Sequence, residues 1–366
     1  MNYKENLFFI AECLTINHEA KNNNRIETIL KSNTVDWDEV VKLSTAQYVF
    51  PALYYNLKRA DFLHYLPDEL VNYMQYISNL NKERNEQIIA QATEINNLLQ
   101  AYDIHPIFLK GTGNLLEGLY EDIGERMVGD IDFIFSKEDY PKVIKILSED
   151  GYSKVHQTEY DFPQFKHHPR LQKEGKIAAV EIHKELLLEK YAKEFNYELI
   201  QKDAQIINGI QVLSYRNQLS LSIIAKQIND GGLYHKNIAL RNAYDVFLLS
   251  KKTNALIAFD QFETLKNPLT CFLASCYITF NKPRSLEYKT SSNIEEYLAI
   301  FNAQMMDDEL RRKNLKSADK KLFVNSRVKI LYKSIVDKDH RTWLYKRITD
   351  KEWQQQKLIQ LGLKKA

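Results

Sequence analysis

Cysteine, glycine and proline are all scarce in this sequence of 366 residues, which contains 3 Cys, 11 Gly and 8 Pro. A small, odd number of cysteines argues against a disulfide framework and is typical of a reducing compartment. Cys271 and Cys276 lie five residues apart in an apolar segment with helical spacing. This spacing does not match a zinc site, so we expect buried thiols. The shortage of Gly and Pro also argues against a loop-rich, all-β fold.

Long apolar runs are absent as well. No stretch approaches the roughly 18 apolar residues that a membrane-spanning helix needs. A short apolar run occurs near the start, but Glu5 and Glu12 flank it and no small-residue cleavage site follows. We therefore predict no signal peptide, no membrane partner and a cytoplasmic location. The composition, 44% hydrophobic and 27% charged, is ordinary for a globular protein.

The net charge is only +2, but the charges are unevenly distributed. Residues 311–366 contain 17 Lys and Arg against 5 Asp and Glu, whereas the preceding residues contain 33 against 43. A basic region of this kind favours a polyanion such as RNA, or an acidic partner. The alternative is a solvated helical face that balances an acidic body.

Apolar periodicity divides the chain into three parts. Residues 1–104 have helical spacing and end in one long helix that begins near Pro67. Residues 105–215 contain short apolar strands between helices, and residues 216–366 are helical again. We predict an α+β protein in which a small mixed sheet lies between N-terminal and C-terminal helical lobes. The expected strands are 106–109, 130–135, 152–156 and 176–183.

Asp130 and Asp132 lie two residues apart on the second of these strands, so both carboxylates point to one face. Two neighbouring anions repel each other unless a cation lies between them, and Mg²⁺ prefers carboxylate and phosphate oxygens. Two such ions stabilise the attacking and leaving oxygens in phosphoryl chemistry. Glu181, on the strand at 176–183, is the best candidate for a third carboxylate, provided that this strand lies beside the first. It would help to activate an attacking hydroxyl.

A strand-to-helix turn precedes the aspartates, at Lys110, Gly111 and Thr112. Glycine in such a turn lets backbone N–H groups approach phosphate oxygens, and the following helix N-terminus favours anions. Lys110 adds a positive charge, and Arg126, four residues before Asp130, is a candidate for holding a triphosphate or pyrophosphate. The spacing of a Walker A loop is absent.

These motifs together resemble the bacterial uncharacterised nucleotidyltransferase family, within the DNA polymerase beta-type nucleotidyltransferase superfamily. The resemblance rests on an ordered series that extends from an apolar strand to a later acidic strand. It comprises Lys110, Gly111, Tyr120, Arg126, Asp130, Ile131, Asp132 and the run Glu181-Ile182-His183. The segment LRNAYDVFLL, with Asp245, resembles a further helix of that family.

The resemblance implies a nucleotidyltransferase core at 105–215 that uses two Mg²⁺ ions. It implies transfer of a nucleoside monophosphate from an NTP, ATP among the candidates, to a hydroxyl or similar acceptor. Asp130, Asp132 and Glu181 would bind the metals, while Lys110, Gly111, Thr112 and Arg126 would bind the nucleotide. The acceptor stays open between RNA such as a tRNA end, a protein hydroxyl and a small molecule, and so does the oligomeric state.

Three departures from the family pattern bear on this reading. The usual Gly-Ser or Gly-Gly is Gly111-Thr112 here, and the distance from Gly111 to Asp130 is longer than in compact members. Both departures concern the binding of the phosphates and not that of the metals. The third carboxylate is a glutamate where an aspartate is expected. Glutamate has a longer side chain but binds the same ion.

Other polar residues support weaker hypotheses. The spacing of a zinc site is absent among His156, His167, His168 and His183. His183 could orient a metal ligand or contact a phosphate, and a packed histidine fits the sequence equally well. We expect Tyr120 in the core or at a rim, Asp245 either as a helix cap or in a pair with Arg241 one helical turn away, and Arg241 at the surface. The segment 229–232 is typical of a turn.

Two other functions remain compatible with these residues. One is a non-catalytic, antitoxin-like module that binds a nucleotide or a partner on the same fold. A clustered set of acidic residues argues against it, because a module without catalysis does not need three adjacent anions. The other is phosphohydrolase chemistry, in which water replaces the acceptor.

Overall fold

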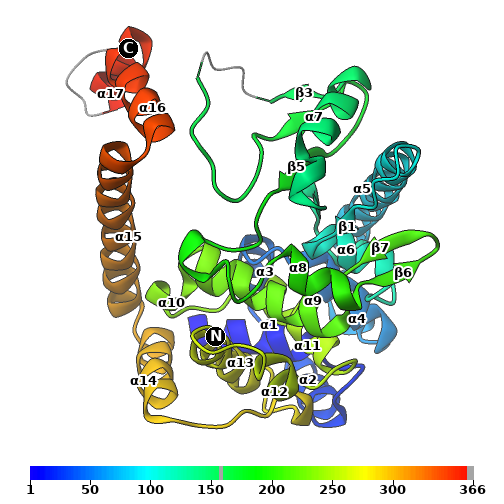
Figure 1. Ribbon diagram of the computed structural model, residues 1–366. Coiled ribbons are helices and arrows are strands. Elements are labelled where there is room, and N and C mark those ends of the chain that lie inside the picture. The colour runs from blue at the N-terminus through cyan, green and yellow to red at the C-terminus, as the bar shows by residue number, and fades with distance from the viewer. Residues whose placement is uncertain (156–159, 361–366) are drawn as a thin grey trace.

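The computed structural model describes residues 1–155 and 160–360 (Figure 1). A seven-stranded mixed sheet is flanked by helices from both ends of the chain, which confirms the predicted α+β class. The two helical groups also pack against each other, since α1 near the N-terminus contacts α13 and α14 of the C-terminal half. None of the helices in the described ranges combines the length and apolar character needed to cross a membrane.

Five α-helices form the N-terminal group. The first begins with a capping box, in which the Asn2 side chain accepts from the Glu5 backbone N–H and the Glu5 carboxylate accepts from the Asn2 N–H. The fifth is the predicted long helix, whose buried stripe includes Met74, Ile88 and Ile95. The elements are α1 (Tyr3–Cys13), α2 (Ala20–Lys31), α3 (Trp37–Ala46), α4 (Phe50–Arg59), η1 (Leu63–Tyr65) and α5 (Asp68–Gln100).

The sheet has the strand order β3-β4-β5-β2-β1-β7-β6. At its centre β2 pairs in parallel with β5 and antiparallel with β1, while β1 pairs in parallel with β7. Of the predicted strand 152–156, the structure has β3, and His156 lies outside the described residues. The strands are β1 (Ile107–Phe108), β2 (Asp130–Ile134), β3 (Ser153–Lys154), β4 (Leu171–Gln172), β5 (Ala179–His183), β6 (Gln205–Ile207) and β7 (Ile210–Val212).

Helix α6 (Lys110–Glu117) follows β1 directly and packs closely against the sheet. Gly113 makes this approach possible, because a Cβ at this position would lie only 2.7 Å from the carbonyl oxygen of Phe108. The other elements of this part are η2 (Ile123–Glu125), η3 (Lys137–Asp139), α7 (Tyr140–Glu149), η4 (Glu189–Tyr191), α8 (Tyr197–Ile200) and η5 (Gln201–Asp203).

The chain after β7 is helical, as predicted. Apolar side chains of α9, α11 and α13 are almost wholly buried, so these helices form the centre of the C-terminal group. The elements are α9 (Tyr215–Ile224), the π-helix η6 (Ala225–Asn229), α10 (Gly232–His235), α11 (Leu240–Ser250), α12 (Ala255–Phe259), α13 (Lys266–Thr279), η7 (Arg284–Leu286) and α14 (Ser292–Met306).

The last three helices form a separate arm along one side of the molecule (Figure 1). This C-terminal arm, residues 308–360, comprises α15 (Asp308–Val336), α16 (Lys338–Thr349) and α17 (Lys351–Gln360). The body holds α15 through α10 and α14, whereas most apolar side chains of the arm are exposed. The arm contains most of the basic region identified in the sequence.

Candidate active site

Strands β2 and β5 bring three carboxylates together at the centre of the sheet. Asp132 pairs directly with Glu181 in the parallel register, and Asp130 lies two residues earlier on the same face of β2. The predicted adjacency of the two strands is therefore confirmed. Asp132 and Glu181 are buried, while Asp130 is partly exposed.

Two basic side chains neutralise these carboxylates. The Lys110 ammonium lies 2.6 Å from Asp132 Oδ1 and 3.7 Å from Glu181 Oε2. Arg170 reaches in from the segment before β4, where its guanidinium binds Asp130 Oδ2 at 2.9 Å and Glu181 Oε1 at 2.6 Å. Each cation therefore bridges two of the three anions, which offsets the repulsion between them.

His183 lies on the same face of β5, two residues after Glu181. Its Nε2 is 2.8 Å from Asp132 Oδ1 and 3.7 Å from Glu181 Oε2. One ligand atom from each of Asp132, Glu181 and His183 lies within 4.8 Å of the others. Oxygens dominate this group, and adding Asp130 gives three carboxylates, a donor set that fits a hard divalent cation such as Mg²⁺. A histidine bonded to a ligating carboxylate orients it.

Burial and neighbouring charges shift the pKa values of the two aspartates in opposite directions. Burial alone would raise the pKa of Asp132, but Lys110 and His183 hold it well below its usual range. The pKa of Asp130 is raised, first by burial and then by the nearby charges of Asp132 and Glu181. Asp132 is thus ionised throughout the physiological range.

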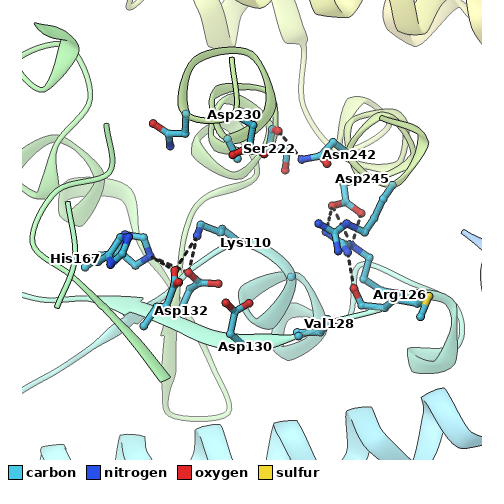
Figure 2. Close-up of a pocket in the computed structure, with 18 of the residues that line it drawn as sticks. Lys110, Arg126, Val128, Asp130, Asp132, His167, Ser222, Asp230, Asn242 and Asp245 are labelled. Carbon is cyan, nitrogen blue, oxygen red and sulfur yellow. Dashed lines mark hydrogen bonds and ion pairs between the residues drawn. The ribbon is translucent and has the colours of Figure 1, made fainter. Parts of the chain in front are cut away.

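The carboxylates form one wall of a cavity of about 350 Å³. Figure 2 shows the opposite wall, where Ser222, Asp230 and Asn242 face Asp130 and Asp132 across the opening. This wall is built from α9, η6 and α11 of the C-terminal helices. The residues that complete the lining include Lys110, Gly111, Val128, Lys166, His167, Arg170, Asn229 and Arg241.

A buried ion pair closes one end of the cavity. Arg126 donates from Nε and Nη2 to the carboxylate of Asp245, at 2.8–3.1 Å, and from Nη1 to the carbonyl of Met127. Tyr120 also donates to Asp245, at 2.7 Å, and is buried in the core as expected. The expected pair between Asp245 and Arg241 is wrong, because the buried partner is Arg126 from the turn before β2.

This geometry gives Arg126 a different setting from the one the sequence predicts. It lines the cavity, but each of its three guanidinium nitrogens already donates a hydrogen bond. Its bonds to Asp245 and Met127 use three of the five guanidinium N–H groups, so a phosphate contact would have to use the remaining N–H on Nη1 or Nη2. Arg241, which was expected at the surface, instead lines the cavity, with its guanidinium 4.9 Å from the Tyr48 ring centroid. Burial lowers the pKa of Arg241, and no carboxylate among the described residues forms an ion pair with it.

The turn at 110–112 connects β1 to α6 at the edge of the cavity. Lys110 has a left-handed backbone, with φ of 52°, which turns the chain sharply from the strand into the helix. Gly111 lines the cavity, whereas Thr112 is buried and donates from Oγ1 to the Asp130 carbonyl at 2.9 Å. The Thr112 side chain therefore ties the turn to β2, and a nucleotide contact by Thr112 could involve only its backbone.

Several cavity residues were not identified from the sequence. Lys166 and Arg170 lie in a segment without periodicity, and the cluster of basic residues and histidines just before the Glu181 strand was the only signal for them. Asn229 and Asp230 were interpreted as a turn, but they end the π-helix η6 and line the cavity. π-helical segments are frequent at functional sites.

The chain belongs to the uncharacterised nucleotidyltransferase family, whose profile matches residues 33–284. This match covers the sheet, the carboxylates and most of both helical groups, so the family predicted from the motifs is confirmed. None of the curated proteins compared with the chain matches it.

Two solved structures are similar to parts of the chain. One is an antigenic nucleotidyltransferase-like protein from Paracoccidioides brasiliensis, with 15% identity and a TM-score of 0.30 over 63% of this chain and 93% of that one. The other is JHP933 from Helicobacter pylori, with 15% identity and a TM-score of 0.30 over 65% of this chain and 98% of that one. Similarities this weak say nothing about the substrate of this protein.

Proposed function

We propose that the protein transfers a nucleoside monophosphate from an NTP to an acceptor with the help of Mg²⁺. The observation that carries the proposal is the convergence of Asp130, Asp132 and Glu181 on one face of two paired strands, inside a cavity with cations that have no ion-pair partner in the described part of the chain. Membership of a nucleotidyltransferase family supports the same reaction class.

The three carboxylates would hold the metal, as two ions in the complete site. Bound Mg²⁺ would neutralise charge on the α-phosphate and favour ionisation of the acceptor hydroxyl. His183 orients Asp132 through its Nε2 contact and so fixes the direction of one ligand oxygen. Glu181, the neighbour of Asp132 across the strands, would help to accept the proton of the acceptor hydroxyl.

The remaining cations of the cavity would bind the triphosphate. Lys166 and Arg241 line it without an ion-pair partner among the described residues, and burial lowers the pKa of each. A half-buried cation without a counter-ion is favourable only where an anion binds. The N-terminus of α6, at Lys110 and Gly111, adds backbone N–H groups and the positive end of the helix dipole.

Among the possible acceptors, RNA has the strongest physical support. The basic region from 311 onwards has an excess of twelve positive charges in the sequence, and most of the lysines and arginines of the described arm, residues 308–360, are exposed where a polyanion can reach them. A protein hydroxyl and a small molecule remain the other acceptors. An antitoxin-like binding module is the alternative function, but three buried or half-buried carboxylates are a cost that binding alone does not explain.

The test uses the full chain with each α-labelled NTP, Mg²⁺ and a total cell extract. We expect label to enter one acceptor fraction with the wild type and with Asp103→Asn, a fully exposed control, but not with the double variant Asp130→Asn, Asp132→Asn. Release of γ-label without incorporation of α-label would indicate hydrolysis instead. Equal NTP binding by the wild type and the double variant, with no transfer, would support the non-catalytic module.

A further inference from the structure

A second cavity, of about 370 Å³, lies next to the first and shares His183 with it. Its walls come from the ends of β2 and β5, the start of α7, and the segment 160–170 that precedes β4. Tyr140, Phe165 and Lys184 contribute the side chains that matter most. Its size falls within the roughly 300–1,000 Å³ that is usual for small-ligand sites.

The charge in this cavity is not balanced. The Lys184 ammonium lies 4.6 Å from the centre of the Tyr140 ring, and no carboxylate of the described chain forms an ion pair with it. The neighbouring Glu185 is paired with Lys137, so it does not compensate Lys184. Half-burial lowers the pKa of Lys184, which marks a cation that a bound anion would stabilise.

The aromatic walls match a nucleobase. The Tyr140 ring is held in place by a hydrogen bond of 2.6 Å between its hydroxyl and His168 Nδ1, and Phe165 is 39% exposed toward solvent. Aromatic rings bind bases by stacking with little regard to sequence, and a lysine beside them can bind the phosphate. The second cavity lacks the three carboxylates, so a metal-bound triphosphate fits the first cavity and not this one.

The segment 160–170 connects this cavity to the C-terminal arm. Phe162 packs edge-on against Trp343 of α16, with ring centroids 4.8 Å apart, and the Tyr160 hydroxyl donates to Asp350 at 2.5 Å. Farther along the same segment, Lys166 lines the first cavity and accepts backbone hydrogen bonds at its carbonyl from Lys184 and Glu185. The segment 160–170 therefore connects the basic arm, through Phe162, to both cavities, through Phe165 and Lys166.

We propose that this second cavity binds the 3′-terminal nucleotide of an RNA acceptor, with Tyr140 and Phe165 against the base, Lys184 at a phosphate, and the arm holding the preceding backbone. The proposal rests on the function proposed above, because it supplies the hydroxyl that attacks the NTP. It places the terminal sugar next to His183, whose ring lies between the two cavities and contacts Asp132.

The test compares Lys184→Gln and Phe165→Ala with the wild type, using a short mixed-sequence RNA that ends in a 3′-hydroxyl. We expect each variant to raise the KM for RNA by roughly tenfold, because Phe165→Ala removes a base stack worth about 1–3 kcal/mol and Lys184→Gln removes the cation at the phosphate. The KM for NTP should change by less than about twofold, because neither residue lines the first cavity. Neither substitution should impair folding, since Lys184 has no ion pair with any described residue and Phe165 is partly exposed.

Matched controls distinguish an effect at the second cavity from the general effect of losing a charged or an aromatic side chain. Lys142→Gln removes another lysine that lies over a tyrosine ring, 5.9 Å from Tyr102, outside both cavities. Tyr76→Ala removes an aromatic side chain that is 61% exposed on α5. Both controls should keep the wild-type KM for RNA within about twofold.

A second readout does not depend on turnover. RNA carrying a photoreactive thiouridine at its 3′ end should crosslink to Tyr140 or Phe165 in the double variant Asp130→Asn, Asp132→Asn. Crosslinks confined to the arm, or RNA binding by Lys184→Gln and Phe165→Ala equal to that of the controls, would overturn the proposal. Label transferred to a polypeptide and not to RNA would overturn the acceptor class but leave the NTP chemistry intact. Failure of the wild type to bind NTP would instead reject the proposed function.

Discussion

The two ends of the first cavity contain ion pairs of very different kinds. At the sheet end, Lys110 and Arg170 are partly exposed and are shared among three carboxylates. At the helical end, Arg126 and Asp245 are both buried, and each donor nitrogen of the arginine is used. The first set can exchange partners when a metal or phosphate binds, whereas the second cannot without exposing a buried charge. We infer that the sheet end performs chemistry and that the helical end maintains the shape.

The largest effect should come from Asp132→Asn. Loss of one carboxylate from the proposed metal site should reduce transfer on the order of 10³-fold, in line with the removal of one electrostatic contact to a transition state. The free energy of unfolding should change by less than about 2 kcal/mol, because Lys110 keeps Glu181 as a partner. Label transfer and urea unfolding measure the two quantities. Asp103→Asn, whose side chain is fully exposed, serves as the control.

Asp245→Asn should give the converse result. The Arg126 guanidinium would stay buried without its anion, which typically costs about 3–5 kcal/mol of stability. Urea unfolding at neutral pH measures this loss. Asp308→Asn, which removes an exposed partner of Arg311, should cost less than about 1 kcal/mol. If Asp245→Asn lowered the free energy of unfolding as little as this control, the distinction between the two ends of the cavity would be lost.

Lys110→Gln sharpens the comparison, because two affinities should move in opposite directions. Removing the ammonium beside Asp132 and Glu181 should strengthen binding of Mn²⁺ alone by roughly tenfold, equal to about 1.4 kcal/mol. The KM for NTP should rise, since a cation at the turn is lost. Isothermal titration and steady-state kinetics test the two changes, with the exposed Lys145→Gln as control. Weaker binding of both metal and NTP would contradict the exchange of partners.

A smaller effect is expected from Glu117, a partly buried carboxylate at the C-terminal end of α6 that belongs to neither set of ion pairs. Burial raises the pKa of Glu117 to about 7, although the side-chain amides of Gln218 and Gln205 partly oppose the shift. The fold therefore favours the protonated acid, so its contribution to stability falls as the pH rises from the ordinary 4.5 through about 7.

Glu117→Gln removes this dependence. The variant should gain about 1–2 kcal/mol relative to the wild type between about pH 5 and about pH 8, a range reduced for partial exposure of the side chain. Unfolding by urea at both pH values measures the difference. A gap between the two proteins that stays constant with pH would mean that Glu117 is already ionised in the fold.

Local sequence patterns were sufficient to predict which residues meet at the sheet end of the cavity, but not which residues meet at the helical end. The spacing of Asp130 and Asp132 requires a shared face on any strand, and the alternation around Glu181 identified its partner strand. The pair of Arg126 and Asp245 joins residues 119 positions apart, which no local period can reveal. Helical spacing indicates the nearer Arg241 instead, although helical geometry permits that pair without requiring it.

Irregular segments concealed the remaining residues. Lys166 and Arg170 reach their positions because their segment is attached to β5 at one end and to α16 at the other, two contacts that depend on tertiary packing. Helical spacing correctly indicated helices at both ends of the chain. It could not indicate that the arm would leave the body, because exposed apolar residues such as Leu331 and Ile335 have the same periodicity as buried ones.

The parallel register of β2 and β5 also makes the protein modular. Backbone hydrogen bonds between these strands fix the distance from Asp132 to Glu181, whatever the length or course of the chain that joins them. That connection contains α7, β3, β4 and the segment 160–170, and so most of the second cavity. If the proposed function holds, insertions or exchanges in this connection would change which acceptor is bound while the three carboxylates keep their spacing, so a single connection would adapt one sheet to many acceptors.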